Sequence, residues 1–432
     1  MVQGICIIVF MIAIMALMVA RKMPTTIALF VLAIGISLIG GVSFADLSTN
    51  VIAGGAVKLA SNIMIAIFAS WLGSIMEVTG ITRTMIKKGA ELGGDKTVVV
   101  TIILYVIGSL IHAVLTGLGG AIMVGSIMIP ILIAVGVDKS TAACVYLWAY
   151  GTGNTFSLDT TSNYASITST EFQLVYNYSL ILAAICAVSA IVFIIVRIKI
   201  VGKKFAFSAP TGGQEEEIET SDYQIKGVLG ALSMISPIMP IVLVAVFHWE
   251  VIPAIMVSIL WAVLLTCTHS NWKKTMNMMS KTLYEGFRRQ APASTMMIAI
   301  GMLLQAVNQE SVSTALRPFM EAVVPGSELG CILFFAILAP LVFYRGPLNL
   351  WGLGAGLAAL IISLGLLPNQ VVMAGFVAVA VLQVVSCPTN THNTWAAGFV
   401  SEDATQITFK QLPFIWPAVA LMVIIGVLRF WV

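Results

Sequence analysis

Two short stretches place hydroxyl, amide and titratable side chains in a sequence that is otherwise apolar: LDTTSNYA at 158–165 and CPTNTHNTWA at 387–396. Oxygen atoms of Thr, Ser and Asn suit hard cations such as sodium, and their O–H and N–H groups can donate to a carboxylate. Asp159 and His392 add one titratable group to each stretch. These residue types predict reversible binding of a small ion or solute.

The surrounding composition predicts an all-α polytopic membrane protein. Of 432 residues, 59% are hydrophobic and 9% charged, whereas soluble domains carry about 25% charged residues. Apolar runs such as 4–20, 178–196 and 416–432 are long enough to cross a bilayer core of about 30 Å as helices. The first run is followed, not preceded, by the basic Arg21 and Lys22, so we expect a retained helix and no signal peptide.

An internal repeat divides the sequence into two halves. A shift of about 229 residues superimposes Pro24 on Pro253, Thr160 on Thr389 and, with slippage of one residue, Asn163 on Asn393. We therefore expect a first repeat over 1–202 and a second over 227–432, joined by a polar linker at 203–226.

The basic residues predict that the two repeats have opposite orientations. With the N-terminus outside, 16 of the 22 Lys and Arg residues fall in cytoplasmic loops, among them 81–96, 268–290 and the linker. The loop 81–96 has four basic residues, whereas its repeat partner 310–325 has only Arg317. Equivalent loops are thus expected on opposite sides of the membrane.

The polar stretches are expected to break transmembrane helices. Apolar residues 146–156 and 376–386 each run directly into one of them, and Pro388 cannot continue a helix. A break inside the bilayer leaves backbone N–H and C=O groups without hydrogen-bond partners. It persists only where protein, water or a bound solute supplies those partners. Inverted repeats with broken helices are typical of secondary transporters.

Each half also has an earlier glycine-rich interruption. The segments 97–136 and 330–365 are long enough for two helical arms, which we interpret as paired helices or a re-entrant hairpin with tips at 116–120 and 345–349. Close packing of small residues is the alternative explanation.

Three charged or titratable side chains have more than one interpretation. Arg345 could contact an anionic substrate, since its guanidinium matches a carboxylate or phosphate, or snorkel to the headgroups, or form an internal ion pair. Asp159 could ligate a cation, carry a proton or cap the following helix. His392 could couple protons, hold the substrate or form hydrogen bonds as a neutral ring.

With these stretches in place, the chain resembles the ion transporter superfamily of bacterial secondary carriers. That group includes the divalent anion:sodium symporters, the large membrane subunit of the TRAP dicarboxylate transporters and the gluconate-type permeases. The resemblance implies two inverted halves, each with a re-entrant hairpin and a broken helix, in a bacterial inner membrane. It also implies a homodimer and an elevator-like movement of the substrate domain.

The resemblance implies two sets of site residues. The substrate set is Thr116, Gly117, Arg345, Gly346, Asn349, Thr161, Ser162, Asn163, Thr391, His392 and Asn393. The cation set is Asn154, Thr155, Asp159, Thr160, Thr389 and Asn390.

We therefore expect a secondary importer of a small organic anion (a mono- or dicarboxylate or a sugar acid) driven by sodium or protons. A sodium/proton antiporter and the membrane subunit of a binding-protein-dependent importer are the alternatives. The six cysteines show no disulfide or metal-ligand spacing, and no nucleophile–base pair stands out. The sequence thus indicates no enzyme, no transition metal, no cofactor besides a coupling ion such as sodium, and no nucleic-acid partner.

Overall fold

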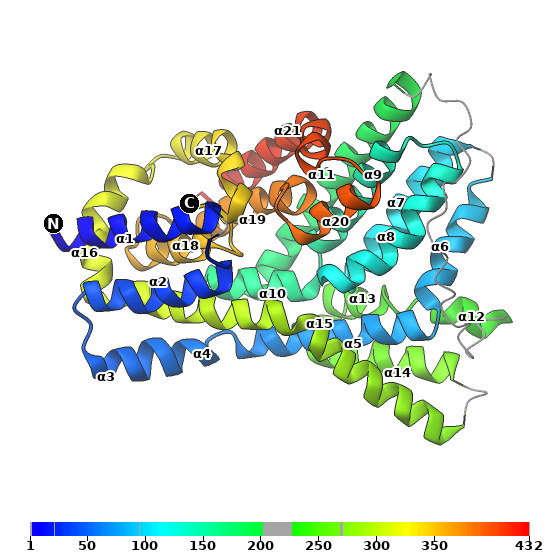
Figure 1. Cartoon of the computed structure of the whole chain (residues 1–432), viewed down its shortest axis with the longest axis horizontal. Coiled ribbons are helices and arrows are strands. Elements are labelled where there is room, and N and C mark those ends of the chain that lie inside the picture. Colours follow the sequence, from blue (N-terminus) through cyan, green and yellow to red (C-terminus); the bar gives the residue numbers. More distant parts are fainter. Residues whose placement is uncertain (1, 21, 95, 202–226, 268–270, 432) are drawn as a thin grey trace.

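The computed structural model describes residues 2–20, 22–94, 96–201, 227–267 and 271–431, and within these ranges every regular element is a helix (Figure 1). By length and composition, six helical segments can cross a membrane: Phe44–Val78, Gly117–Ala134, Phe172–Lys199, Trp272–Val307, Asn369–Phe399 and Ala404–Phe430. The bent pair Glu310–Val323 and Glu328–Ile337 adds a seventh if it forms one span. The all-α polytopic membrane fold is confirmed. The predicted linker 203–226 lies outside the described residues.

The first half contains α1 (Val2–Val19), α2 (Thr25–Ile39), α3 (Phe44–Asp46), a π-helical segment (Leu47–Gly54), α4 (Gly55–Val57), α5 (Ala60–Val78), α6 (Ile81–Leu92), α7 (Thr97–His112), α8 (Gly117–Ala134), α9 (Lys139–Thr155), α10 (Leu158–Ile167) and α11 (Phe172–Ile195). The second half contains α12 (Gly227–Ser233), α13 (Met239–Ala245), α14 (Val251–Thr266), α15 (Trp272–Val307), α16 (Glu310–Val323), α17 (Glu328–Ile337), a 3₁₀ segment (Ala339–Arg345), α18 (Leu353–Ser363), α19 (Asn369–Ser386), α20 (Thr391–Phe399) and α21 (Ala404–Phe430).

The order of helices repeats with the shift that the sequence predicts. Moved by about 229 residues, α6 falls on α16, α7 and α8 fall on α17 and α18, and α9, α10 and α11 fall on α19, α20 and α21. The helix α15 is the exception, because its 36 residues cover the positions of α3, α4 and α5 together. The opposite orientation of the two halves remains a prediction.

Three predicted loops are helical instead. Residues 272–290 of the expected loop 268–290 form the first half of α15, while 81–92 and 310–323 form α6 and α16. In α6 the buried Ile81, Met85, Ile86 and Gly89 recur every three to four residues, as on one face of an amphipathic helix. The basic residues lie on the other face, which lowers the average hydropathy and made the segment resemble a loop.

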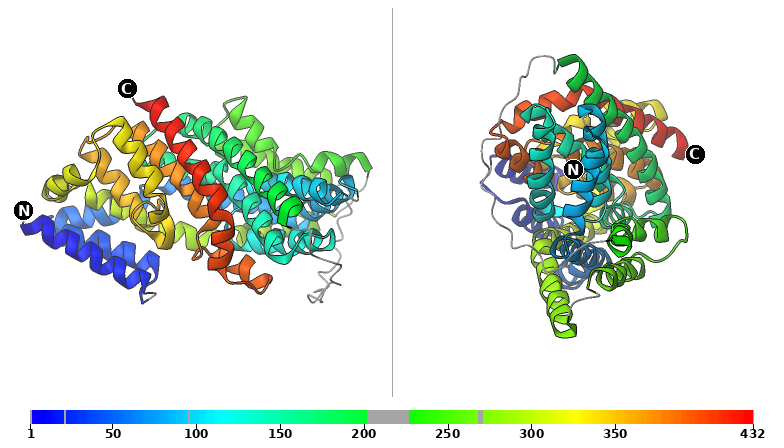
Figure 2. Two further views of the ribbon diagram at one scale, coloured as in Figure 1. Left: turned by 90° about the horizontal axis from the view of Figure 1, so that it is seen from above. Right: turned by 90° about the vertical axis from the view of Figure 1, so that its right-hand side faces the viewer.

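The molecule is elongated, with three helices running along its length. α2, α5 and α15 lie side by side, and α1 and α16 pack together at one end (Figures 1 and 2). α9 and α19 form the interior: every residue is buried from Ser140 to Thr155 and from Val371 to Ser386. These two helices pack against each other, with Gly151 so close to Val385 that a Cβ at position 151 would overlap the valine methyl group. The predicted breaks therefore occur in helices that other helices cover.

Gly153→Ala is expected to destabilise the protein. A Cβ at 153 would overlap the carbonyl oxygen of Ser109 in α7 and come within 2.8 Å of the His112 Cβ. Backbone atoms cannot rotate away as a side chain can, so we expect a loss of about 1–3 kcal/mol from overpacking. Thermal unfolding in detergent measures it. Gly398→Ala in α20 is the matched control, since a Cβ there meets nothing within 4 Å; equal effects of both variants would contradict the packing argument.

Candidate functional site

Both predicted helix breaks are present. α9 ends at Thr155 and α10 begins at Leu158, and α19 ends at Ser386 and α20 begins at Thr391. We call residues 156–157 the first break and residues 387–390 the second break. The second contains Pro388, whose ring cannot continue the helix.

Side chains from the second break, α20 and α21 cap the helix that precedes the break. The last four carbonyl groups of a helix have no partner within the helix. In α19 each of the four accepts a side-chain hydrogen bond: Gln383 O from Asn390 Nδ2 at 2.8 Å, Val384 O from His392 Nε2 at 2.9 Å, Val385 O from Asn393 Nδ2 at 3.1 Å and Ser386 O from Thr408 Oγ1 at 2.6 Å. The motif TNTHN thus stabilises the broken end in a region where water cannot.

This capping occupies part of the predicted ligand set. Asn390 Oδ1 also accepts from Gln383 Nε2 at 2.6 Å, so both ends of this amide are in use. Thr389 Oγ1 lies 3.2 Å from Cys387 Sγ, and Thr391 is exposed. Asn393 Oδ1 has no hydrogen-bond partner although the residue is buried. Within the motif TNTHN, Asn393 therefore keeps a buried hydrogen-bond acceptor, its Oδ1, for a ligand.

The first break is joined to the glycine-rich interruption between α7 and α8. Asp159, which is 4% exposed, accepts hydrogen bonds from Thr116 Oγ1 at 3.0 Å and from Ser157 Oγ. The backbone N–H of Gly117 points to the Tyr150 hydroxyl at 3.3 Å. The hairpin tip itself lies earlier than predicted: residues 113–116 connect the two helices, and 117–120 are the first turn of α8. Gly117 has a φ of +81°, which glycine adopts without strain.

The second interruption is shaped by Asn349. Its Nδ2 donates to Val342 O at 3.0 Å and its Oδ1 accepts from Trp351 N at 2.8 Å, so one side chain closes the turn. Gly346 ends the 3₁₀ segment that precedes this turn. Arg345 Nη1 donates to Trp351 O at 3.1 Å, and no described acidic side chain pairs with it. The guanidinium is thus partly buried and keeps further N–H groups that can donate hydrogen bonds.

Two tyrosines connect these four segments. The ring of Tyr150 in α9 stacks on His392 with centroids 4.1 Å apart and lies 4.7 Å from the His112 ring at the end of α7. Tyr164 is buried in α10, which packs against α9, α18 and α19, and the 3₁₀ segment that ends in Arg345 also packs against α19. The structure therefore brings both breaks and both glycine-rich interruptions to one place, which we call the central junction.

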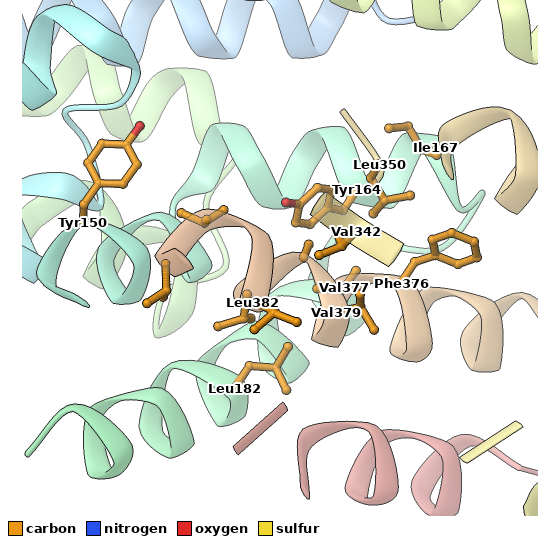
Figure 3. Close-up of a cluster of buried hydrophobic side chains, with 14 of the residues drawn as sticks. Tyr150, Tyr164, Ile167, Leu182, Val342, Leu350, Phe376, Val377, Val379 and Leu382 are labelled. Carbon is orange, nitrogen blue, oxygen red and sulfur yellow. The ribbon is translucent and has the colours of Figure 1, made fainter. Parts of the chain in front are cut away.

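A small cavity lies within the central junction. A cavity of about 10 Å³, room for about one water molecule, is bounded by α9, α10 and α19; its lining residues are Asn154, Thr155, Tyr164, Val377, Ala380, Val381 and Val384. Figure 3 shows Tyr164 and Val377 within the surrounding hydrophobic cluster. Along α10, Thr160, Thr161, Ser162 and Asn163 are all buried. This cavity cannot hold a solute of several heavy atoms unless α9, α10 and α19 separate.

Several residues of the junction were not predicted. Tyr150, Tyr164 and Gln383 lie in or beside apolar runs, where sequence alone favours packing. Arg289, predicted to lie in a loop, is in α15: it bonds Glu77 of α5 and, at 2.8 Å, Glu285. Its Cδ is 3.3 Å from where a Cβ of Gly119 would be. Arg289 therefore holds α5 and α15 together directly beside the start of α8.

One known family matches most of the chain. Residues 9–364 match the family model described as C4-dicarboxylate anaerobic carrier (DcuC). No curated protein sequence matches the chain. The expectation of a membrane carrier family is confirmed, and with it the broad expectation of an organic-anion carrier. Membership of the wider ion transporter superfamily remains a prediction.

Arg289→Met is expected to lower the free energy of unfolding by about 1–3 kcal/mol, because charged hydrogen bonds are lost and two carboxylates remain side by side. Arg288→Met is the matched control: Arg288 bonds only Glu285 and its side chain is 79% exposed, so its loss should matter much less. Thermal unfolding in detergent compares the two. If the variants unfold at the same temperature, the network beside Gly119 contributes no more than a surface ion pair.

Proposed function

Because the chain belongs to the C4-dicarboxylate anaerobic carrier family, we propose that it is a secondary transporter that moves a C4-dicarboxylate across the membrane. The observation that carries the proposal is the central junction, where two broken helices meet in the buried core and the 3₁₀ segment of the partly buried Arg345 packs against α19. Uncharged hydroxyl and amide groups can bind a solute and release it again, as transport requires.

We assign the first carboxylate of the substrate to Arg345. Its Nη1 bonds only a neutral backbone carbonyl, so the guanidinium keeps further donors for an anion. A guanidinium presents paired donors that match the two oxygens of a carboxylate. The positive φ values of Tyr344 and Arg345, 56° and 59°, are uncommon for these residue types and support a functional role for this turn.

The coupling cation, sodium or a proton, is assigned to the first break. Asp159 is a buried carboxyl group whose described partners are hydroxyl and backbone groups, so a cation or a proton must offset its charge. In the described chain no side chain donates to the carbonyls of Thr152, Gly153 or Thr155 at the end of α9, in contrast to the capped end of α19. Such carbonyls are hard oxygen ligands.

Substrate access requires movement, and glycines line the boundary where it would occur. Gly73 of α5 contacts Leu115, Gly119 contacts Arg289, and Gly356 of α18 contacts Leu303 of α15. Small residues let helices approach closely, and a larger residue at Gly73 or Gly356 would overlap the facing leucine. This supports an elevator-like displacement of the junction past α5 and α15. A homodimer in a bacterial inner membrane, with the linker in the cytoplasm, completes the proposal.

The two alternative functions require different residues and different partner proteins. A sodium/proton antiporter has no need of Arg345, and the matched family is one of dicarboxylate carriers. The membrane subunit of a binding-protein-dependent importer would not transport dicarboxylate alone. Purified chain in liposomes separates all three.

Wild-type protein in liposomes is expected to take up radiolabelled succinate saturably, without an added binding protein. Arg345→Gln should lower the initial rate at sub-saturating succinate about 10- to 100-fold, the value of a charged hydrogen bond to a carboxylate. Arg317→Gln is the control, since Arg317 is a half-exposed arginine on α16 that pairs with Glu321. Absence of uptake by the wild type, or equal rates for both variants, would reject this function.

Asp159→Asn is expected to separate coupling from binding. The amide retains the shape of Asp159 and can accept from Thr116, but it carries no charge. Accumulation driven by a sodium or pH gradient should therefore be lost, while exchange of internal for external succinate continues. Repeating the assay with sodium replaced by choline, and at two pH values, identifies the cation. Undiminished accumulation by Asp159→Asn would show that the cation binds elsewhere.

A further inference from the structure

Asn62 lies outside both broken helices yet contacts one of them. It is the third residue of α5 and is 3% exposed. α5 contacts α10, and in Figure 1 α10 lies between α5 on one side and α19 on the other. No sequence pattern distinguishes Asn62 from other polar residues at the start of a helix.

Its side chain is held in place by α10 but only partly satisfied. Ser162 Oγ donates to Asn62 Oδ1 at 2.8 Å, while Asn62 Nδ2 has no hydrogen-bond partner. Turning the amide over would exchange the two atoms and still leave one of them unpaired. Buried polar groups are nearly always paired, so an oriented amide with an unpaired N–H keeps a donor for a ligand or a water molecule.

The unpaired groups cluster on the same stretch of α10. Asn163 is 0% exposed, and neither its Oδ1 nor its Nδ2 has a partner. The hydroxyl of Thr161 is likewise buried without a partner. Together with Asn62 Nδ2, four polar atoms on one turn of α10 and the facing start of α5 lack hydrogen bonds.

We propose that Asn62 is a specificity-determining residue whose amide N–H donates to the second carboxylate of a dicarboxylate bound against α10. The assignment rests on the proposed function and extends it, because it adds α5 to a site otherwise built from the breaks and hairpins. A neutral donor suits this role, since a second guanidinium would hold a dianion too tightly for release. Monocarboxylates of the same length have no group to accept from it.

Asn62→Leu keeps the approximate volume and removes the donor. In liposomes we expect the KM for succinate to rise about 10-fold or more while kcat changes little, because an interaction with a charged carboxylate is lost. Inhibition by butyrate, which has four carbons and a single carboxylate, should be unchanged. Thr82→Val is the control: Thr82 is also buried with an unpaired hydroxyl, but on α6, and its KM should match the wild type.

Ser162→Ala tests the same contact from α10. It removes the group that orients the amide, so we expect a rise in the KM for succinate of about 3- to 10-fold. If Asn62→Leu does not fold, the KM of Ser162→Ala for succinate decides whether Asn62 contacts the substrate. An unchanged KM in the folded variants, or equal losses of succinate and butyrate binding, would overturn the assignment and make Asn62 a packing residue. Absence of succinate uptake by the wild type would instead reject the proposed function, and this assignment with it.

Discussion

The structure depends on how an interrupted helix satisfies its backbone inside a membrane protein. A transmembrane helix can stop in the bilayer core only if its final carbonyl groups find other donors. At the end of α19 each of these carbonyls accepts from a side chain, namely that of Asn390, His392, Asn393 or Thr408. The side chains of Asn390, His392 and Asn393 reach back to the end of the helix that they follow, and the His392 ring stacks on Tyr150 of α9. The capping bonds thereby place one half of the central junction against the other.

The two breaks differ in a way that suggests different tasks. At the second, side chains of Asn390, α20 and α21 cap the broken helix end, which suits a rigid support. The first has a buried carboxyl group, Asp159, that reaches across to Thr116 beside α8. A change in what Asp159 binds would therefore be transmitted to the hairpin formed by α7 and α8 through a single hydrogen bond. We infer that the first break responds to the coupling ion, while the second holds the position of the junction.

The sequence predicted these breaks because small polar residues and Pro388 are costly in an apolar helix unless they have a purpose. The shift that aligns Thr160 with Thr389 in the sequence also aligns the residue ranges of whole helices, although the repeat as an inverted pair of domains stays a prediction. Prediction failed where local patterns are ambiguous. The amphipathic first half of α15 has the composition of a loop, and Tyr150 and Tyr164 resemble ordinary core residues. The partnership of Asn62 with Ser162 spans 100 residues and depends on how α5 and α10 pack, which no local pattern encodes.

The charges of the junction explain why a carrier of this form would need coupling ions. Arg345 and Asp159 carry opposite formal charges and form no ion pair with each other in the described structure, so together they add no net charge to the junction. A dicarboxylate brings two negative charges, so the occupied junction would hold an uncompensated dianion in a region of low dielectric constant. Unpaired charges in such a region cost several kcal/mol each. Cations that bind together with the substrate remove this cost. When the dicarboxylate or the cation binds alone, its charge stays uncompensated. Binding of anion and cation is then mutually favourable, and a gradient of one can drive movement of the other.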